Sequence, residues 1–235
     1  MLTIAKAPSD LIVHQIGYND DSDTGDDVWE GSAAYSFPTA AAATTIISDS
    51  ANDAAAGTGA RTCLVRGLDT NFEPVSQIAT LNGVAAVTLT TQLRRVHSVQ
   101  VLTAGSGGVN AGIINVRHGA TNLAHMIAGW NTTKMAIYTI PAGRYGFLLG
   151  WGVSSDGTSP ILAGLQTRTP GDPWQTRDLH LCGTVGSTLA EARFDAPIRF
   201  APTTDLRVRM ILGANGLDLT ARMALLLSEL PIINL

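Results

Sequence analysis

Apolar and polar residues alternate along short stretches of this chain, which is the pattern of half-buried β-strands. In Leu206–Leu212 two arginines take one face, while Leu, Val and Met take the other. The alternation returns in Leu217–Leu225 after a Gly-Ala-Asn-Gly turn, so the two stretches predict an antiparallel hairpin. Further strands are predicted at Thr62–Leu68, Val84–Thr91, Val96–Thr103, Ile113–Arg117, Met135–Ile140, Ile161–Thr167 and Ile198–Phe200.

Helical patterns are poor in the same sequence. Twenty-four glycines and ten prolines interrupt it at short intervals. The best helical candidate, Pro38–Thr45, has no polar face and runs into β-branched residues. Many short strands separated by turns are typical of sandwiches and closed barrels. We therefore expect an all-β fold, an antiparallel β-sandwich of jelly-roll-like or related topology.

The first 30 residues differ from the rest. They are acidic and contain one short apolar run, Leu11–Ile16. We expect residues 1–30 to form an N-terminal arm with an acidic loop; the alternative is an ordinary first strand followed by a surface loop. Residues 31–235 would then form the sandwich. Its glycine-rich segment at 104–112 is either a long hairpin loop or a linker that divides the sandwich into two lobes.

Charge is scarce, which narrows the classes of function. Charged residues make up 14% of the chain, against about a quarter in ordinary soluble domains. Apolar residues make up 45%, and the mean hydropathy is +0.18. Such a surface can pack against neighbours at low desolvation cost, which favours a protein that assembles. The net charge is −4 and no basic patch stands out, so the sequence does not predict nucleic-acid binding.

No apolar run approaches the length that spans a bilayer, and no signal peptide is visible. We therefore expect a soluble protein, made in a cytoplasm, without a membrane partner. Cys63 and Cys182 each lie in an alternating apolar run and are expected to be buried, reduced thiols. Thirteen arginines against two lysines favour paired or interface cations, since a guanidinium group is easier to desolvate. Arg207 and Arg209 are the interface candidates.

Motifs for catalysis are missing from the sequence. The Gly-rich segment at 105–108 has no Lys-Ser/Thr after it, and a G-x-G-x-x-G spacing fails because residue 110 is Asn. There is no G-x-S-x-G elbow, and none of the five histidines has a carboxylate or serine at a telling spacing. No pair of acids is singled out for glycoside cleavage. We expect no catalytic residues and no cofactor.

The acidic segment offers a weak calcium candidate. Asn19, Asp21 and Asp23 occupy alternate positions, and Glu30 follows eleven residues after Asn19. These positions mimic ligands 1, 3, 5 and 12 of a Ca²⁺-binding loop, but the required glycine arrives one residue late, at Gly25. The sequence favours a solvated acidic loop, or an acidic face that meets arginines of a neighbouring subunit.

Two tryptophans are candidates for exposed anchors. Trp130 lies beside Asn131, and Trp174 follows Pro173, so both occupy turn-like positions. An exposed indole can fill a pocket of a partner protein, or stack on a sugar ring. We favour a role for these tryptophans in packing or in a protein interface; the alternative is that they form a platform on which sugars stack.

Several segments resemble one class of known proteins. The run at 48–62 leads through a loop into a strand, 78–83 ends in a Leu-Asn-Gly turn, and 135–143 ends in Ile-Pro-Ala-Gly. Together with segments 65–69, 93–96, 104–112 and 116–118, they resemble virion structural proteins of tailed, often marine, phages. The resemblance covers roughly residues 11–227.

The resemblance implies a non-enzymatic component of the phage particle. Its expected place is the head surface, as a capsid decoration or cement protein that binds through protein–protein contacts. The expected partners are further copies of itself, as a homotrimer, and other virion proteins such as the major capsid protein. The alternative is a tail or fibre component that binds a host-surface carbohydrate. The expected location is the virion.

Overall fold

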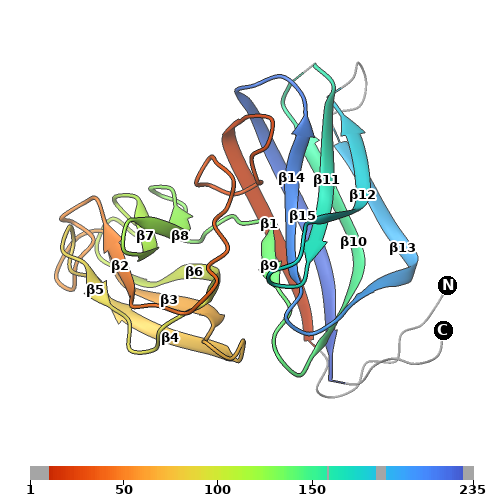
Figure 1. Ribbon diagram of the computed structural model, residues 1–235. Helices are drawn as coiled ribbons and strands as arrows, with labels where there is room; N and C mark the ends of the chain where they lie inside the picture. Colours follow the sequence, from red (N-terminus) through yellow and green to blue (C-terminus); the bar gives the residue numbers. More distant parts are fainter. Residues whose placement is uncertain (1–10, 158, 184–188, 230–235) are drawn as a thin grey trace. The chain divides into compact units, whose positions relative to one another are not determined.

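The computed structural model describes residues 11–157, 159–183 and 189–229, and the regular structure in them is all β (Figure 1). The chain forms two compact units. Unit 1 comprises Met1–Ala34 and Ala136–Leu235, and unit 2 comprises Tyr35–Met135. Every strand pairing is antiparallel. The all-β prediction is therefore confirmed.

Unit 1 is a sandwich of two four-stranded sheets. The first, called here the β1 sheet, has the order β1-β15-β10-β13, and the second, the β12 sheet, has the order β12-β11-β14-β9. Their bounds are β1 Leu11–Ser22, β9 Ile137–Thr139, β10 Tyr145–Ser155, β11 Ile161–Arg168, β12 Gln175–Cys182, β13 Leu189–Phe200, β14 Asp205–Leu212 and β15 Leu217–Ser228.

These strand orders are those of a jelly roll. Counted along unit 1 alone, the eight strands are arranged 1-8-3-6 in one sheet and 5-4-7-2 in the other. The first strand pairs with the last, and successive strands alternate between the two sheets except for β11 and β12, which pair with each other; this is the winding of two Greek keys. Unit 2 is inserted between the first and second strands of this jelly roll, after Ala34 and before Ala136.

The N-terminal segment departs from the expected arm. Residues 11–22 form strand β1, paired along its length with β15 from Leu11 opposite Leu227 to Asn19 opposite Leu219. Gly17 permits close packing there, because a Cβ at this position would lie 2.2 Å from the carbonyl oxygen of Val28. The alternative of an ordinary first strand describes residues 11–22 correctly. Residues 1–10 lie outside the described residues.

The division of the chain also differs from the expected one. The boundaries fall at 34/35 and 135/136, whereas residue 30 and the segment 104–112 were the expected places. Segment 104–112 lies inside unit 2, where it carries the end of β6 and the turns that precede β7. It is held there by hydrogen bonds from its backbone to the preceding loops of the same unit. Its glycines therefore serve close packing rather than a linker between lobes.

Trp151 of β10 ties the two sheets of unit 1 together. Its side chain is 1% exposed within the core, among Leu148, Ile161 and Leu225. The indole stacks on His180 of β12 with ring centroids 4.1 Å apart, and its Nε1–H donates a hydrogen bond to Asp178 at 2.9 Å. A large buried indole needs such a partner for its N–H group.

Unit 2 contains two smaller sheets. One has the order β5-β2-β7-β8 and the other β4-β3-β6. Both contribute to buried positions, among them Ile46, Cys63, Val99 and Leu123. The bounds are β2 Thr44–Ser48, β3 Ala60–Leu68, β4 Pro74–Thr80, β5 Val87–Thr88, β6 Arg95–Ala104, β7 Ile114–His118 and β8 Thr121–Met126.

Cys63 and Cys182 are both fully buried free thiols, as the sequence predicts. Burial raises the pKa of Cys63 to about 12, and the charge of Asp53 adds to this effect. The pKa of Cys182 is also raised by burial. Since a thiolate is the reactive form, both groups are chemically protected in the folded chain.

A single buried carboxylate, Asp53, joins the loops of unit 2. Its Oδ1 accepts hydrogen bonds from the backbone N–H groups of Ala60 and Ala111, at 2.7 and 2.8 Å. Its Oδ2 accepts from the N–H of Gly112 at 2.9 Å and from the Ser48 hydroxyl at 2.6 Å. All four donors satisfy a side chain that is 0% exposed. The loop before β3 and the loop before β7 are therefore held by one residue.

We expect Asp53→Asn to destabilise unit 2. An amide NH₂ group would replace one oxygen and face donors rather than accept from them, so buried N–H groups would lose their acceptor. The expected loss in the free energy of unfolding is about 3 kcal/mol or more. Denaturant titration followed by circular dichroism measures it. Glu73→Gln is the control, because Glu73 is an exposed acid of the same unit; equal stability of the two variants would contradict this role for Asp53.

Candidate functional site

The calcium candidates are not assembled into a metal site. Asn19 is fully buried; its amide donates to the carbonyl oxygen of Asp27 and its Oδ1 accepts from the N–H of Asp21. Asp23 is exposed and accepts from the N–H of Gly216, while Glu30 is buried. Among the described residues no group of three or more His, Cys, Asp or Glu side chains could hold a metal ion. Residues 19–22 belong to strand β1 and not to a ligand loop.

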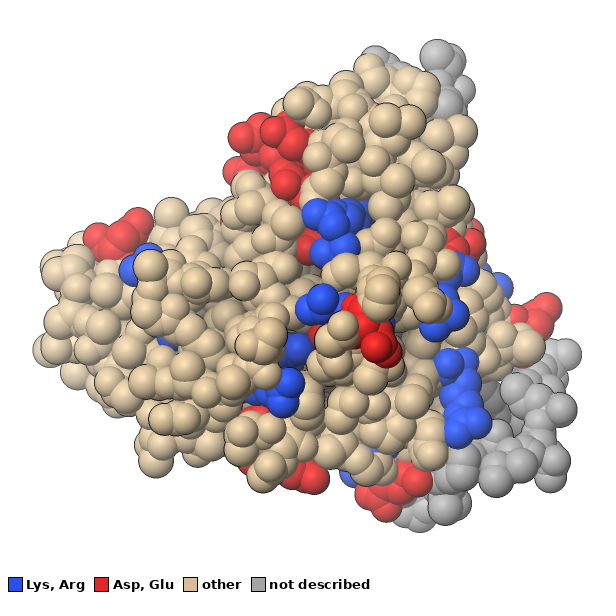
Figure 2. Space-filling view, viewed as in Figure 1, with Lys and Arg blue, Asp and Glu red and all other residues tan. Residues whose placement is uncertain are grey.

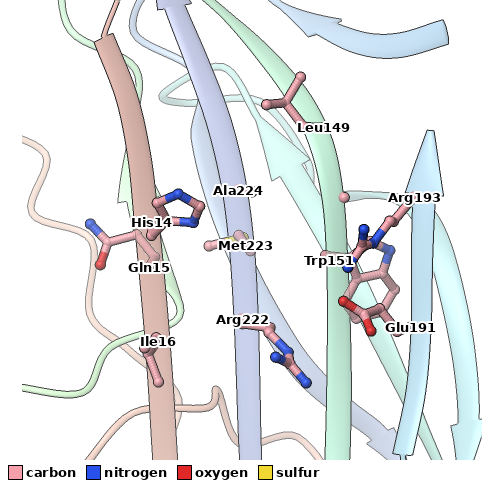
Figure 3. Close-up of a pocket in the computed structure, with 11 residues that line it drawn as sticks. His14, Gln15, Ile16, Leu149, Trp151, Glu191, Arg193, Arg222, Met223 and Ala224 are labelled. Carbon is pink, nitrogen blue, oxygen red and sulfur yellow. The ribbon is translucent and has the colours of Figure 1, made fainter. Parts of the chain in front are cut away.

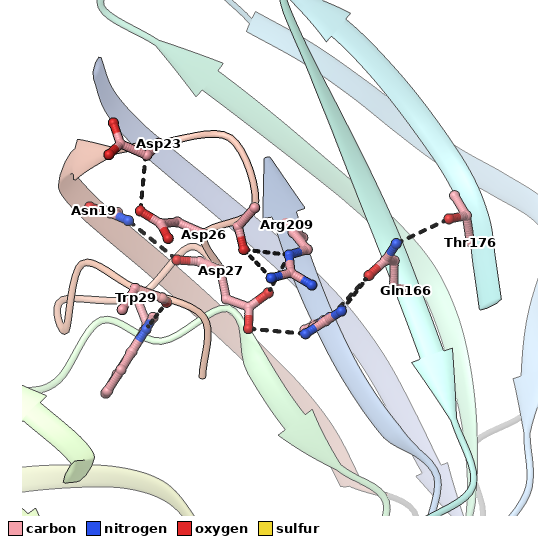
Figure 4. A network of polar contacts seen from close by, with 11 residues as sticks. Asn19, Asp23, Asp26, Asp27, Trp29, Gln166, Thr176 and Arg209 are labelled. Atoms are coloured by element: carbon pink, nitrogen blue, oxygen red, sulfur yellow. Dashed lines mark hydrogen bonds and ion pairs between the residues drawn. The ribbon is translucent and has the colours of Figure 1, made fainter. Parts of the chain in front are cut away.

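The acidic segment instead supplies a buried carboxylate to two arginines of β14. Asp27 is 0% exposed, and its oxygens lie 3.4 Å from Arg207 and 3.6 Å from Arg209. Arg207 also donates through Nε and Nη2 to Gln166, and Arg209 donates to the carbonyl oxygen of Gly25. Figure 4 shows this network, which joins the loop after β1 to β14 and β11.

Burial lowers the pKa of Arg207 to about 10, although Asp27 opposes that effect. The Arg207 residue is 5% exposed. A guanidinium so deeply placed and so fully engaged within its own chain offers little surface to a partner. The expectation of Arg207 as an interface residue is thus corrected: the residue that pairs with it lies in the same chain. Arg209 is partly exposed and also paired with Asp27.

The two candidate tryptophans lie in different units. Trp174 is half-buried in unit 1, where the guanidinium carbons of Arg207 and Arg168 lie 3.9 and 4.5 Å from its ring centroid. These cations occupy ring surface that a sugar would need for stacking. Trp130 of unit 2 is 38% exposed, with the Lys134 ammonium group 5.8 Å from its ring centroid.

An apolar surface covers one end of the outer side of the β12 sheet. Leu181, Leu162 and Leu212 lie opposite one another across β12, β11 and β14. In the next row Gly164 leaves room for two neighbouring side chains, since a Cβ there would lie 3.0 Å from Ile211 and 3.3 Å from Leu179. Leu179, Leu181 and Leu212 are 48%, 59% and 64% exposed. We call this surface the leucine face: Leu162, Leu179, Leu181, Ile211 and Leu212.

A groove lies on the outer side of the β1 sheet, with a volume of about 490 Å³. Its floor runs along β10, which presents Gly150 and Gly152 at successive outward positions. Both glycines allow close approach of β13, because a Cβ would lie 2.7 Å from the carbonyl oxygen of Ala192 or 2.9 Å from that of Ala190. Figure 3 shows the side chains from β1, β15 and β13 that line it.

The groove carries charged groups that no sequence motif singles out. Glu191 and Arg193 alternate on the outward face of β13, and Arg222 projects from β15. The signal was present in the sequence as the alternation Leu-Ala-Glu-Ala-Arg and as the spaced glycines of Gly150-Trp-Gly152. These residues form no recognised motif, because they come from different strands and are brought together only by the register of strand pairing.

Charged side chains are sparse on the face shown in Figure 2, where neutral residues dominate the surface. This agrees with the low charged fraction of 14%. The described charged residues are also often engaged within the chain, as Arg144 is with Glu229 at 3.0 Å. The leucine face and the groove are two surfaces of unit 1 whose chemistry differs from this neutral background.

Loss of the buried charge at Asp27 should be costly. We expect Asp27→Asn to lower the free energy of unfolding by about 3–5 kcal/mol, because Arg207 would keep its buried charge without a carboxylate. Thermal and denaturant unfolding measure the loss. Glu229→Gln, which removes the acid from an exposed ion pair with Arg144, should cost at most about 1 kcal/mol. A similar small cost for both variants would show that the Asp27 pair is not a stabilising contact.

No protein-family model, curated protein or solved structure matches this chain. The described residues include no helix long and apolar enough to cross a membrane. The surfaces described above are therefore the basis on which a function can be assigned.

Proposed function

We propose that this chain is a non-enzymatic structural protein of a tailed-phage particle, and that it decorates the capsid as a homotrimer. The observation that carries the proposal is the leucine face. Its three most exposed members present about half or more of their surface to solvent, side by side on one sheet. Contiguous exposed apolar surface of this kind marks protein–protein contact sites.

The fold supports the proposal by analogy. Jelly rolls with two four-stranded sheets are the common architecture of viral capsid domains, and also of lectins. Fold alone does not determine function, since one architecture hosts many activities. The analogy gains weight here because the outer side of the β12 sheet is apolar at one end, where a solvated sheet would carry polar side chains.

The segments that resemble phage virion proteins support the proposal in a second way. Segments 48–62 and 104–112 meet at Asp53, and the Asn82-Gly83 turn joins them through a hydrogen bond from the Gly83 N–H to the Asp53 carbonyl oxygen. The resemblance is thus carried by residues that fix the loops of unit 2. Those residues hold the loops of unit 2 in place, a structural role that suits a component of the phage particle.

The homotrimer follows from the geometry of a capsid, which offers local three-fold positions. In such a trimer the leucine face of each copy would be covered by a neighbouring copy, while other surfaces would contact the major capsid protein. A sparse charge distribution lowers the desolvation cost of both contacts. The alternative of a tail or fibre component that stacks sugars on Trp174 has less support, because two guanidinium groups approach that ring.

A charge placed in the leucine face should break the trimer. We expect the purified chain to have the mass of a trimer at micromolar concentration, and Leu181→Asp to be monomeric at the same concentration, because a carboxylate cannot be buried there unpaired. Sedimentation equilibrium or native mass spectrometry measures the mass. Ile78→Asp, at an exposed residue of unit 2, is the matched control and should remain trimeric.

A wild-type monomer would refute self-association through this face. The place in the particle needs a second measurement, a cryo-EM map of the phage that contains the chain. Density at three-fold or quasi-three-fold positions of the head would support the decoration role. Density at the tail tip would replace it with a tail component.

A further inference from the structure

The groove on the β1 sheet is lined by two arginines whose guanidinium groups make no ion pair, hydrogen bond or ring contact with the described residues. The sequence has thirteen arginines, all within the described residues. Eleven of them contact a hydrogen-bond acceptor, a carboxylate or an aromatic ring of the same chain. Arg193 and Arg222 make no such contact with the described residues, and both line this groove.

Strand register places these arginines on opposite sides of the groove floor. Arg222 and Glu191 both lie opposite Gly152, one from β15 and one from β13. Ala224 of β15 and Arg193 of β13 likewise both lie opposite Gly150. Because neighbouring strands are about 4.8 Å apart, each pair is separated by about 10 Å across a floor without side chains. The charges therefore face a shared channel and not each other directly.

The groove is elongated. A second hollow of about 270 Å³ adjoins it and shares Ile16 and Arg222 with it. The combined floor follows β10 from Gly150 to Ser154, which is about 14 Å of extended strand. The larger hollow alone has the volume of an ordinary ligand site. An extended ligand of several linked rings suits this shape better than a compact one.

The chemistry of the walls limits what the ligand can be. Two guanidinium groups select for carboxylate or another oxyanion, which they bind through paired hydrogen bonds. Glu191, which lies two residues from Arg193 on β13 and lines the same groove, disfavours a dense polyanion such as a nucleic acid, and can accept hydrogen bonds from hydroxyl groups. Ile16 and Leu149 add apolar surface for the C–H faces of a ring. A polymer with spaced carboxylates, many hydroxyls and apolar ring faces satisfies all three.

We infer that this groove binds an acidic glycan, a chain of sugars that carries carboxylate groups of the uronic or sialic acid kind. Arg193 and Arg222 pair with carboxylates, and Glu191 accepts from sugar hydroxyls. The site is distinct from the leucine face, so the inference holds independently of the proposed place in a phage particle. It also locates carbohydrate recognition away from Trp130 and Trp174, the residues that the sequence first suggested.

Trigalacturonate and its fully methyl-esterified form are a matched pair of probes, since they differ in the carboxylate charge. We expect the full-length chain to bind the acid at least about tenfold more tightly than the ester, as measured by isothermal titration calorimetry, because charged hydrogen bonds are lost with the ester. Arg222→Gln should weaken binding of the acid by about tenfold or more. Ala224→Phe should abolish it by filling the floor beside Gly150 without removing a charge.

Arg66→Gln, at an exposed arginine of unit 2, is the control and should bind as the unchanged chain does. Melting temperatures of all variants establish that they are folded. Because Arg222 and Ala224 alter the groove in different ways, misfolding of one still leaves the other as a test. The inference is overturned if the acid binds no better than the ester, if neither groove variant affects binding, or if a panel of uronic- and sialic-acid oligosaccharides fails to bind.

Discussion

The pairing of β1 with β15 is the constraint on which the rest of unit 1 depends. It joins residues that are about two hundred positions apart, from Leu11 opposite Leu227 onward, and it closes the strand order of the jelly roll. By placing β1 at the edge of its sheet, it positions the following loop so that Asp27 reaches the arginines of β14. The same register sets which side chains from β1, β15 and β10 share the groove.

The local pattern of apolar and polar residues predicts many of the strands of this fold but little of how they are paired and connected. Alternation predicted β14 and β15 as an antiparallel hairpin, and this pairing is wrong, because the two strands lie in different sheets and each pairs with other strands. Their intervening turn is present, but the chain crosses between sheets there, because each strand buries one face against the opposite sheet. Val84–Thr91 was predicted as one strand and keeps Val87–Thr88 alone, since Asn82 to Ala85 form turns and bridges around Asp53. These differences arise from contacts between residues far apart in the sequence, which the pattern of a single stretch does not reveal.

The candidate sites show the same limit for charged residues. Its place on the polar face of a strand made Arg207 an interface candidate, yet Arg207 is buried within its own chain, where Asp27 offsets part of the desolvation cost. Arg222 has the same local pattern but is exposed, and no ion pair joins it to the described residues. The sequence thus predicts the residue types that could build a site. The register of the strands, and the residues that folding brings next to each side chain, decide which of them are structural and which remain available to a ligand.

The insertion of unit 2 between β1 and β9 sets the order in which parts of the chain can fold during synthesis. Unit 2 is contiguous and ends at Met135, so it can fold as soon as it leaves the ribosome. Strand β1 emerges before it, but its partner β15 is the last of the described strands to be made, so the edge of β1 that pairs with β15 stays unpaired while about two hundred residues are added. An exposed edge strand is a site for wrong pairing, and the exposed Leu11, Ile12 and Ile16 of β1 add apolar surface to that risk. The insertion of unit 2 therefore lengthens the time during synthesis in which β1 is open to wrong pairing.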